Sequence, residues 1–360
     1  MKDERAHLQL FDLIAREWML ASPVTGISFN ANSTAVAFAC ADGAVYLAAT
    51  ADKESSNIRV RRAVDTARLT IAPRAKPPGP LKPADFTEGR TSPVVAHGAD
   101  GFAYAKSTGR INALTPGGIS VHLQVKDAGP ITVVASHAGK VAHICDDRVM
   151  LGDRTLATLP DIAAMAFSPD GQTLAVAHGD AVSRWRVAAP QDAPIHTPLA
   201  GRPTTILWRG DGAFLALCLQ AGGFSVIDAV SNIATQHGNF PSAVRHVAFA
   251  AATNTVVASG AFRVAAWSMA DNSDVMSGKP GLVLIDAIAT CPTRNLVAVG
   301  YANGLISLAE IGKTQEILLR EDTGTGITAM AWSSNGTFLA LAGTDGSAAL
   351  VEFPDSMFKS

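Results

Sequence analysis

A repeat of about 41 residues dominates the second half of the sequence. Each copy has an apolar stretch, a polar turn and a second apolar stretch, as in AMAFSPDGQTLAVAH from Ala164. The residues that end the first stretch are spaced by 41, 41, 41 and 42 positions: Phe167, Trp208, Phe249, Thr290 and Trp332. Fainter copies begin at Gly26, Val94 and Thr132. A near-constant period of this length indicates a repeat architecture in which each unit packs on its neighbours.

Within a unit, apolar and polar residues alternate, which indicates short β-strands. In the clearest copy, AMAF and TLAVAH are separated by Ser-Pro-Asp-Gly, and AVSRWRV follows a second tight turn. Pro and Gly supply the backbone angles of such turns. A fourth strand is expected in the variable stretch before the next unit, as in PIHTPLA and NIATQHG. Four antiparallel strands cannot cover both faces of their own sheet, so we predict an all-β fold of radially stacked sheets, a β-propeller.

These motifs resemble those of the WD40 family over nearly all of residues 24–354. FSPDG is similar to the family's first turn. The aspartate of the family's tight turn is matched by Asp42, Asp180 and Asp345, and its terminal Trp is matched by Trp185 and Trp267. The closing Asp of the family is matched by Asp228, and the His of its first dipeptide is matched by His237. No unit holds the complete set, so the buried Asp–His–Ser–Trp chain of many family blades is not expected. The resemblance, with an Ala-rich and Lys-poor composition, predicts a divergent bacterial member.

Eight units predict eight four-stranded blades, with seven as the alternative if the two faint units within 92–150 merge. The segment AREWML at 15–20 can complete the blade of residues 326–354, so that the N- and C-terminal strands share it. The preceding HLQLFDLI could instead be an amphipathic helix. We therefore expect one domain over 1–360, with an N-terminal segment at 1–23 that includes the closing strand, blades over 24–354, and an insertion at 57–90.

The insertion is basic and proline-rich, and it is the best local candidate for contact with an acidic partner. PRAKPPGPLKP within it predicts an extended, polyproline-like loop. The candidate partner-binding residues are Arg59, Arg61, Arg62, Arg74, Lys76, Lys82 and, outside the insertion, Lys106. No aromatic residues are interleaved to stack on bases, and the formal net charge is −2. Both features argue against nucleic acid as the partner.

Four residues occupy equivalent positions where second strands end: Cys40, Lys106, Cys145 and His178. Two thiols and an imidazole could bind Zn²⁺ or a similar soft ion. Buried cysteines usually act as small apolar residues, and neighbouring blades should hold these atoms too far apart to share an ion. We therefore expect no metal and no other cofactor. The sequence also has no H-E-x-x-H or G-x-S-x-G motif, so no catalytic residues are predicted.

The composition limits the remaining classes of function. No stretch offers about 18 uncharged apolar residues, so no membrane association is expected. Four widely spaced cysteines fit reduced thiols in the cytoplasm. The sequence thus predicts a monomeric, cytoplasmic scaffold for protein–protein interaction, as the WD40 resemblance implies. The alternatives are a metal-binding or enzymatic propeller that uses the axial channel, and a nucleic-acid-associated factor that uses the 57–90 loop.

Overall fold

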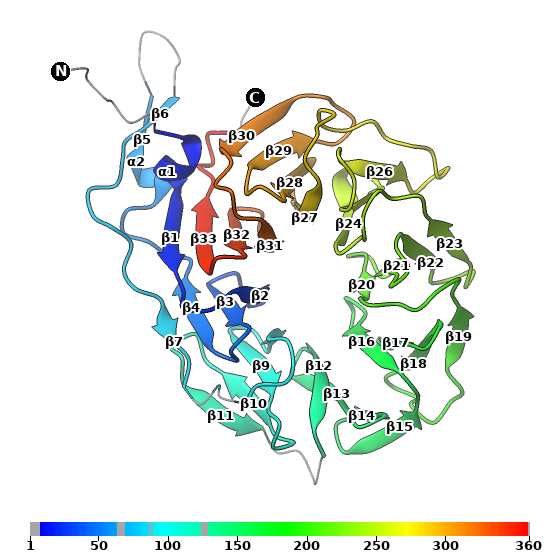
Figure 1. Ribbon diagram of the computed structural model, residues 1–360. Coiled ribbons are helices and arrows are strands. Elements are labelled where there is room, and N and C mark those ends of the chain that lie inside the picture. Colours follow the sequence, from blue (N-terminus) through cyan, green and yellow to red (C-terminus); the bar gives the residue numbers. More distant parts are fainter. Residues whose placement is uncertain (1–7, 63–68, 86, 88, 124–128, 359–360) are drawn as a thin grey trace, which may run out of the picture.

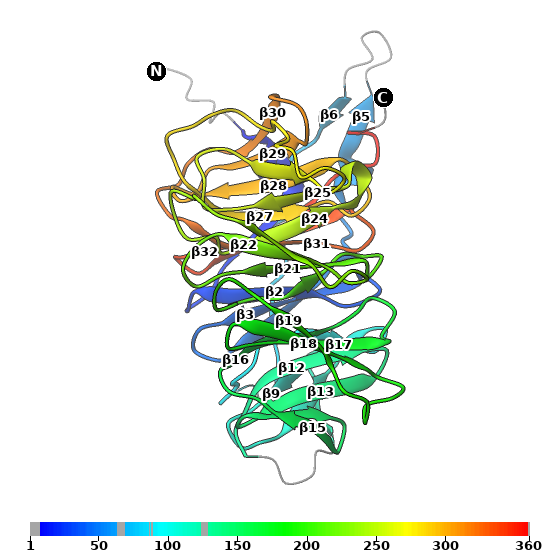
Figure 2. The ribbon, with the colours of Figure 1, turned by 90° about the vertical axis from the view of Figure 1, so that its right-hand side faces the viewer.

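A ring of eight β-sheets around a central axis forms the body of the chain (Figure 1). This computed structural model describes residues 8–62, 69–85, 87, 89–123 and 129–358. Figure 2 shows the same ring from the side, with strands of neighbouring sheets in successive layers. Within the described residues, the prediction of eight blades is confirmed and the seven-bladed alternative is wrong, because the two faint units form separate sheets.

The strands of each blade are given from the inner to the outer edge of its sheet. Blade 1 comprises β2 (Val24–Phe29), β3 (Ala35–Cys40), β4 (Val45–Ala49) and β7 (Lys82–Pro83), and blade 2 comprises β8 (Val95–His97), β9 (Gly101–Ala105), β10 (Ile111–Leu114) and β11 (Ser120–Leu123). Blade 3 comprises β12 (Ile131–His137), β13 (Lys140–Cys145), β14 (Arg148–Leu151) and β15 (Arg154–Thr158). Blade 4 comprises β16 (Ile162–Phe167), β17 (Thr173–His178), β18 (Ala181–Arg186) and β19 (Ile195–Pro198).

Blade 5 comprises β20 (Leu207–Trp208), β21 (Phe214–Cys218), β22 (Phe224–Asp228) and β23 (Ala234–His237), and blade 6 comprises β24 (Val247–Ala250), β25 (Thr255–Ala258) and β26 (Ala265–Ser268). Blade 7 comprises β27 (Ile285–Thr290), β28 (Leu296–Tyr301), β29 (Ile306–Glu310) and β30 (Glu316–Arg320). Blade 8 comprises β31 (Ile327–Trp332), β32 (Phe338–Gly343), β33 (Ser347–Glu352) and β1 (Ala15–Met19). The elements outside the blades are α1 (Leu10–Ile14), α2 (Ser56–Arg59), the 3-10 turn η1 (Ala251–Thr253) and the hairpin of β5 (Val60–Arg62) and β6 (Leu69–Ile71).

The residues that end the inner strands join neighbouring blades. The indole N–H of Trp208 donates to the Ala166 carbonyl at 3.2 Å, and that of Trp332 donates to the Ala289 carbonyl at 3.0 Å. In each case the acceptor is the residue before the end of the inner strand of the preceding blade. The repeat period therefore sets side-chain hydrogen bonds as well as packing.

The closing strand lies where the sequence places it. β1 pairs antiparallel with β33, from Ala15 opposite Val351 to Met19 opposite Ser347. The inner strands β2 and β31 are also in contact, which completes the ring between the last and first blades. This pairing confirms that the N- and C-terminal strands share a blade. The alternative helix is confined to α1, whose buried Phe11 and Ile14 pack into the core of blades 7 and 8.

Blade 6 departs from the predicted four strands, and the expectation is wrong at this blade. In the continuous described segment 129–358 its sheet has three strands, and the next residues make one isolated bridge, between Trp267 and Asp274. Only two backbone bonds flank that bridge: Ser268 N–H to the Ser273 carbonyl, and Val275 N–H to the Ala266 carbonyl. Gly278, Pro280 and Gly281 follow, and proline cannot donate to a ladder, so the pairing ends.

The insertion contains more regular structure than a loop. The β5–β6 hairpin projects beyond the ring (Figures 1 and 2), and β7 supplies the outer strand of blade 1. Between them, the proline-rich segment passes Trp18, whose indole N–H donates to the Gly79 carbonyl at 2.8 Å. The Glu352 carboxylate accepts hydrogen bonds from Ser55 and Ser56 and so fixes α2 to the end of β33. The insertion is therefore anchored to the seam of the ring.

Candidate interaction surfaces

The four residues predicted to lie at equivalent heights do so. Cys40, Cys145 and His178 are the last residues of β3, β13 and β17, and Lys106 directly follows β9. Both cysteines are buried. Burial raises the pKa of the Cys40 thiol to about 11, so it stays protonated at neutral pH and is a poor metal ligand.

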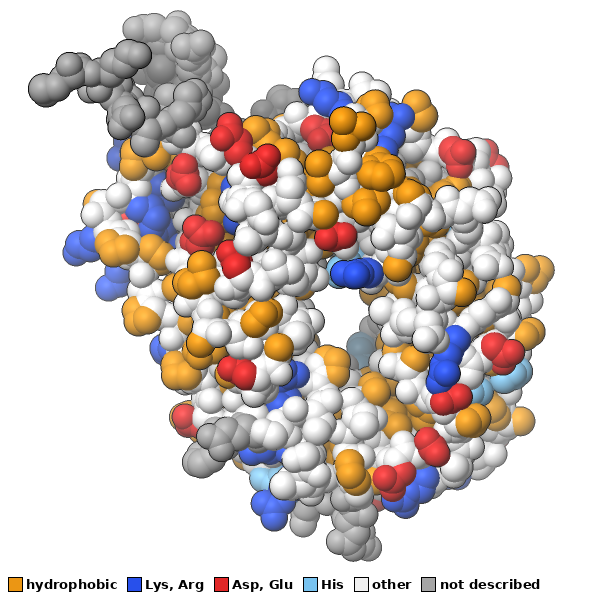
Figure 3. All heavy atoms as spheres, in the orientation of Figure 1, with side chains coloured by type: hydrophobic (Ala, Val, Ile, Leu, Met, Phe, Trp, Pro, Cys, Tyr) orange, Lys and Arg blue, Asp and Glu red, His pale blue; other side chains and the backbone are white. Residues whose placement is uncertain are grey.

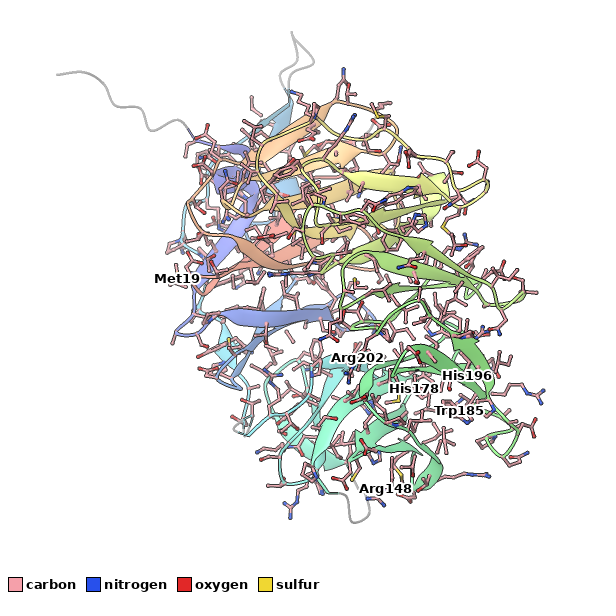
Figure 4. All side chains as sticks on the ribbon, turned by 45° about the vertical axis from the view of Figure 1, so that its right-hand side comes forward. Met19, Arg148, His178, Trp185, His196 and Arg202 are labelled. Carbon is pink, nitrogen blue, oxygen red and sulfur yellow. The ribbon has the colours of Figure 1, made fainter. Side chains whose placement is uncertain are left out.

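His178 is occupied within its own blade. Its Nε2 lies 2.9 Å from the Ser183 hydroxyl, and that hydroxyl lies 3.2 Å from His196 Nδ1, so three strands of blade 4 are linked (Figure 4). Across the described ranges, no three His, Cys, Asp or Glu side chains are placed to hold a metal ion. The fold therefore does not bring Cys40, Cys145 and His178 together as ligands.

Two of the candidate basic residues point into the molecule, which differs from the expectation for a partner-binding loop. Arg59 is only 7% exposed, and its guanidinium donates to the carbonyls of Glu54, Ala72 and Leu13. Arg74 forms an ion pair with Asp52 at 2.6 Å. Both arginines hold the insertion against the ring, because a guanidinium can satisfy several backbone carbonyls at once.

The other basic candidates remain predictions. Arg61, Lys76 and Lys82 are exposed, and Lys106 is half-buried. Arg62 is paired through its backbone with Leu69 in the hairpin, and its side chain lies outside the described part. The seven residues therefore do not form one basic surface, because the side chains of Arg59 and Arg74 make contacts within the molecule.

An exposed apolar cluster lies beside the incomplete fourth strand of blade 6. Leu282 is 96% exposed, Met276 64% and Phe262 42%. We call these three residues the blade 6 patch. Figure 3 shows hydrophobic side chains gathered over the loop that joins β26 to β27.

Backbone hydrogen bonds and Arg263 bring together the segments that carry the blade 6 patch. The Gly281 N–H donates to the Phe262 carbonyl at 3.0 Å, and Arg263 reaches the Met276 sulfur at 3.1 Å. Arg263 also donates to the carbonyls of Ser277 and Gly278. The Glu316 carboxylate of blade 7 accepts from the Lys279 N–H at 2.7 Å. The loop is thus fixed to two blades while its apolar side chains face solvent.

Sequence reasoning missed the blade 6 patch, although one signal for it exists. The segment ADNSDVMSGKPGLVL at 270–284 lacks the alternating pattern expected of a fourth strand. That failure of the pattern could have marked blade 6 as irregular. It could not have shown which side chains are exposed, because exposure depends on contacts with blade 7.

The arrangement of strands now defines the class of protein: an eight-bladed β-propeller closed by its two terminal strands. A sequence model of the anaphase-promoting complex subunit 4 WD40 domain matches residues 288–357. No curated protein matches the chain in sequence. The chain has the fold of a WD40 β-propeller.

Two solved structures share this fold over almost their whole length. A computationally designed protein, Ika8, has a TM-score of 0.68 at 17% identity, and the match covers 96% of this chain and 100% of that one. The C-terminal WD40 domain of Sif2 has a TM-score of 0.64 at 13% identity, with 96% and 99% covered. In the described part of this chain, no helix is long and apolar enough to cross a membrane.

Proposed function

We propose that the chain is a non-catalytic, monomeric platform that binds a partner protein through the blade 6 patch. The carrying observation is that the blade with the incomplete fourth strand presents three large apolar side chains to solvent. Isolated exposed apolar residues are ordinary, whereas grouped ones mark interaction sites in soluble proteins. The WD40 domain whose sequence model matches residues 288–357 belongs to a subunit of the anaphase-promoting complex. This match supports a role in binding other proteins.

The cytoplasm is the proposed compartment. All four cysteines are free and buried, and thiols persist best under reducing conditions. A fluorescent fusion imaged in the source cell tests this part, and an extracytoplasmic signal contradicts it.

Affinity purification with the wild-type chain and two variants tests the platform. The wild-type chain and Ile119→Ser, a matched change at an aliphatic residue of blade 2 that is 61% exposed, should retain the same partner. Met276→Ser combined with Leu282→Ser should lose it, because apolar anchors supply much of the binding energy of an interface. Purified partner is then titrated against all three proteins. Equal affinity for the double variant, or no partner for the wild type, would contradict the proposal.

A further inference from the structure

A small cavity lies between blades 5 and 6 and shares no residue with the blade 6 patch. Its volume is about 290 Å³. The lining residues that matter below are Val226, Asp228, Ile233 and His237 of blade 5, and Met269 and Asp271 of blade 6. We call it the blade 5–6 crevice.

His237 lines this crevice without a hydrogen-bond partner for its ring. The residue is 7% exposed, and its imidazole stacks on Phe224 with ring centroids 4.5 Å apart and planes 8° apart. Trp267 packs on the ring at 4.7 Å. Among the described residues, no hydrogen bond is made to either ring nitrogen. Burial lowers the pKa of His237, so the ring is neutral at pH 7 and offers one acceptor nitrogen.

Two carboxylates flank the crevice and stay ionised. Asp228 accepts from the backbone N–H groups of Val230 and Ser231, which lowers its pKa. Asp271 accepts from the hydroxyl and the N–H of Ser273, and hydroxyl hydrogen bonds from serines lower its pKa as well. The hydrogen bonds from Val230 and Ser231 engage Oδ1 of Asp228, and those from Ser273 engage Oδ1 of Asp271. Each carboxylate therefore keeps capacity for a further donor.

No lysine or arginine is among the residues that line the crevice. Two arginines close to blade 5 are already engaged: Arg209 lies over the Phe214 ring and pairs with Asp211, and Arg184 donates to Ala229 and Asn232. The charge of Arg184 also helps to lower the pKa of Asp228, but Arg184 does not line the crevice. Val226, Ile233 and Met269 give the crevice an apolar part of its lining, beside polar side chains such as Thr235 and Asn272. An occupant should therefore combine an apolar stem with a cationic, hydrogen-donating head.

We propose that the blade 5–6 crevice binds a lysine or arginine side chain of a partner protein. The methylenes lie along the apolar wall, and the head donates to Asp228, Asp271 and the open nitrogen of His237. Ile233, which lines the crevice and is 63% exposed, adds apolar contact around the basic residue. The inference assumes a protein partner, as the proposed function does, but it depends on different residues and is tested without that partner.

Methyl NMR with small probes tests the crevice directly. Butylguanidinium chloride imitates an arginine side chain, and sodium pentanoate supplies a similar stem with the opposite charge. Butylguanidinium should shift the methyl signals of Met269 and Ile233 in a saturable way, and pentanoate should not. Equal shifts with pentanoate, or shifts spread evenly over all methyl groups, would overturn the proposal, whatever becomes of the blade 6 patch.

Two sets of variants complete the experiment. Asp228→Asn with Asp271→Asn keeps the Oδ1 acceptors of both turns and should weaken butylguanidinium binding about tenfold, since two ion pairs are lost. The matched control is Asp42→Asn with Asp345→Asn, whose side chains accept in the same way from the N–H two residues later. His237→Phe retains the ring stack and should also weaken binding. Wild-type affinity in both Asp228/Asp271 and His237 variants would disprove the site.

Discussion

Single residues in this ring are tuned mainly by burial between blades. His143 on β13 is 2% exposed, and its Nδ1 has no hydrogen-bond partner. Burial lowers its pKa from 6.5 to about 4. The unfolded chain therefore binds a proton more readily than the folded chain between these values. The contribution of His143 to stability is complete above pH 6.5 and is lost as the pH falls towards 4.

We expect this histidine to lower the free energy of unfolding by about 2 kcal/mol between pH 7 and pH 5. His143→Leu should remove that share of the pH dependence. His97, His178, His237 and His246, whose pKa values desolvation also lowers, should retain theirs. Urea denaturation at both pH values measures the difference. The control is His122→Leu on the exposed outer strand β11. An unchanged pH dependence in His143→Leu would contradict the assignment.

At this scale the sequence predicts types of residue better than their contacts. Trp208 and Trp332 were identifiable from their period, and both bond to the preceding blade. The structural role of Arg59 was not identifiable from the sequence. A basic pattern is equally typical of a solvated loop and of a side chain that donates to carbonyls of three segments. The direction of such a side chain depends on Leu13 and Ala72, which are distant in sequence.

Among the elements, the short strand β1 is the one that closes the ring. It covers the edge of β33, which would otherwise present unpaired backbone groups. Deletion of residues 1–20 should lower the melting temperature and cause concentration-dependent self-association through β33. Calorimetry and sedimentation velocity measure the two effects. A truncated chain that melts like the full chain and stays monomeric would show that β1 is dispensable.

The β5–β6 hairpin should be dispensable for the ring. The Ala72 N–H donates to the Arg59 carbonyl at 3.1 Å, so the two residues already lie close enough for a short link. Replacement of residues 60–71 by Gly-Gly should leave the melting temperature within a few degrees and remove Arg61 and Arg62. If salt-sensitive binding to an oligonucleotide exists in the full chain and is lost here, the nucleic-acid alternative gains support. Unchanged binding excludes the hairpin as its cause.

The elements also show where sequence patterns stop being informative. The turn Ser-Pro-Asp-Gly and the strands around it are local, and β19 and β23 lie in the predicted stretches PIHTPLA and NIATQHG. Whether blade 6 forms a fourth strand is not determined by its local sequence alone. Residues 277–279 contact Gly312, Lys313 and Glu316 of blade 7, and these contacts compete with pairing to β26.

At the scale of the whole molecule, closure distinguishes this ring from open repeat arrays. An open array has two end units with one neighbour each, and such ends unfold locally. Here every blade has two neighbours, and blade 8 contains strands from both ends of the chain. Local unfolding of any blade exposes two interfaces. The ring should therefore unfold as one cooperative unit.

Two core substitutions far apart in the ring test this cooperativity. Leu350 is fully buried in the core between blades 8 and 1, and Leu217 is fully buried in the core between blades 4 and 5. Replacement of either by alanine should lower the free energy of unfolding by about 2–5 kcal/mol. Both should shift the same single transition in urea, followed by fluorescence and circular dichroism. Leu282→Ala, at an exposed position, should leave that transition unchanged. A second transition in either core variant would mean that blades unfold separately, and that the seam between β1 and β33 does not couple the ring.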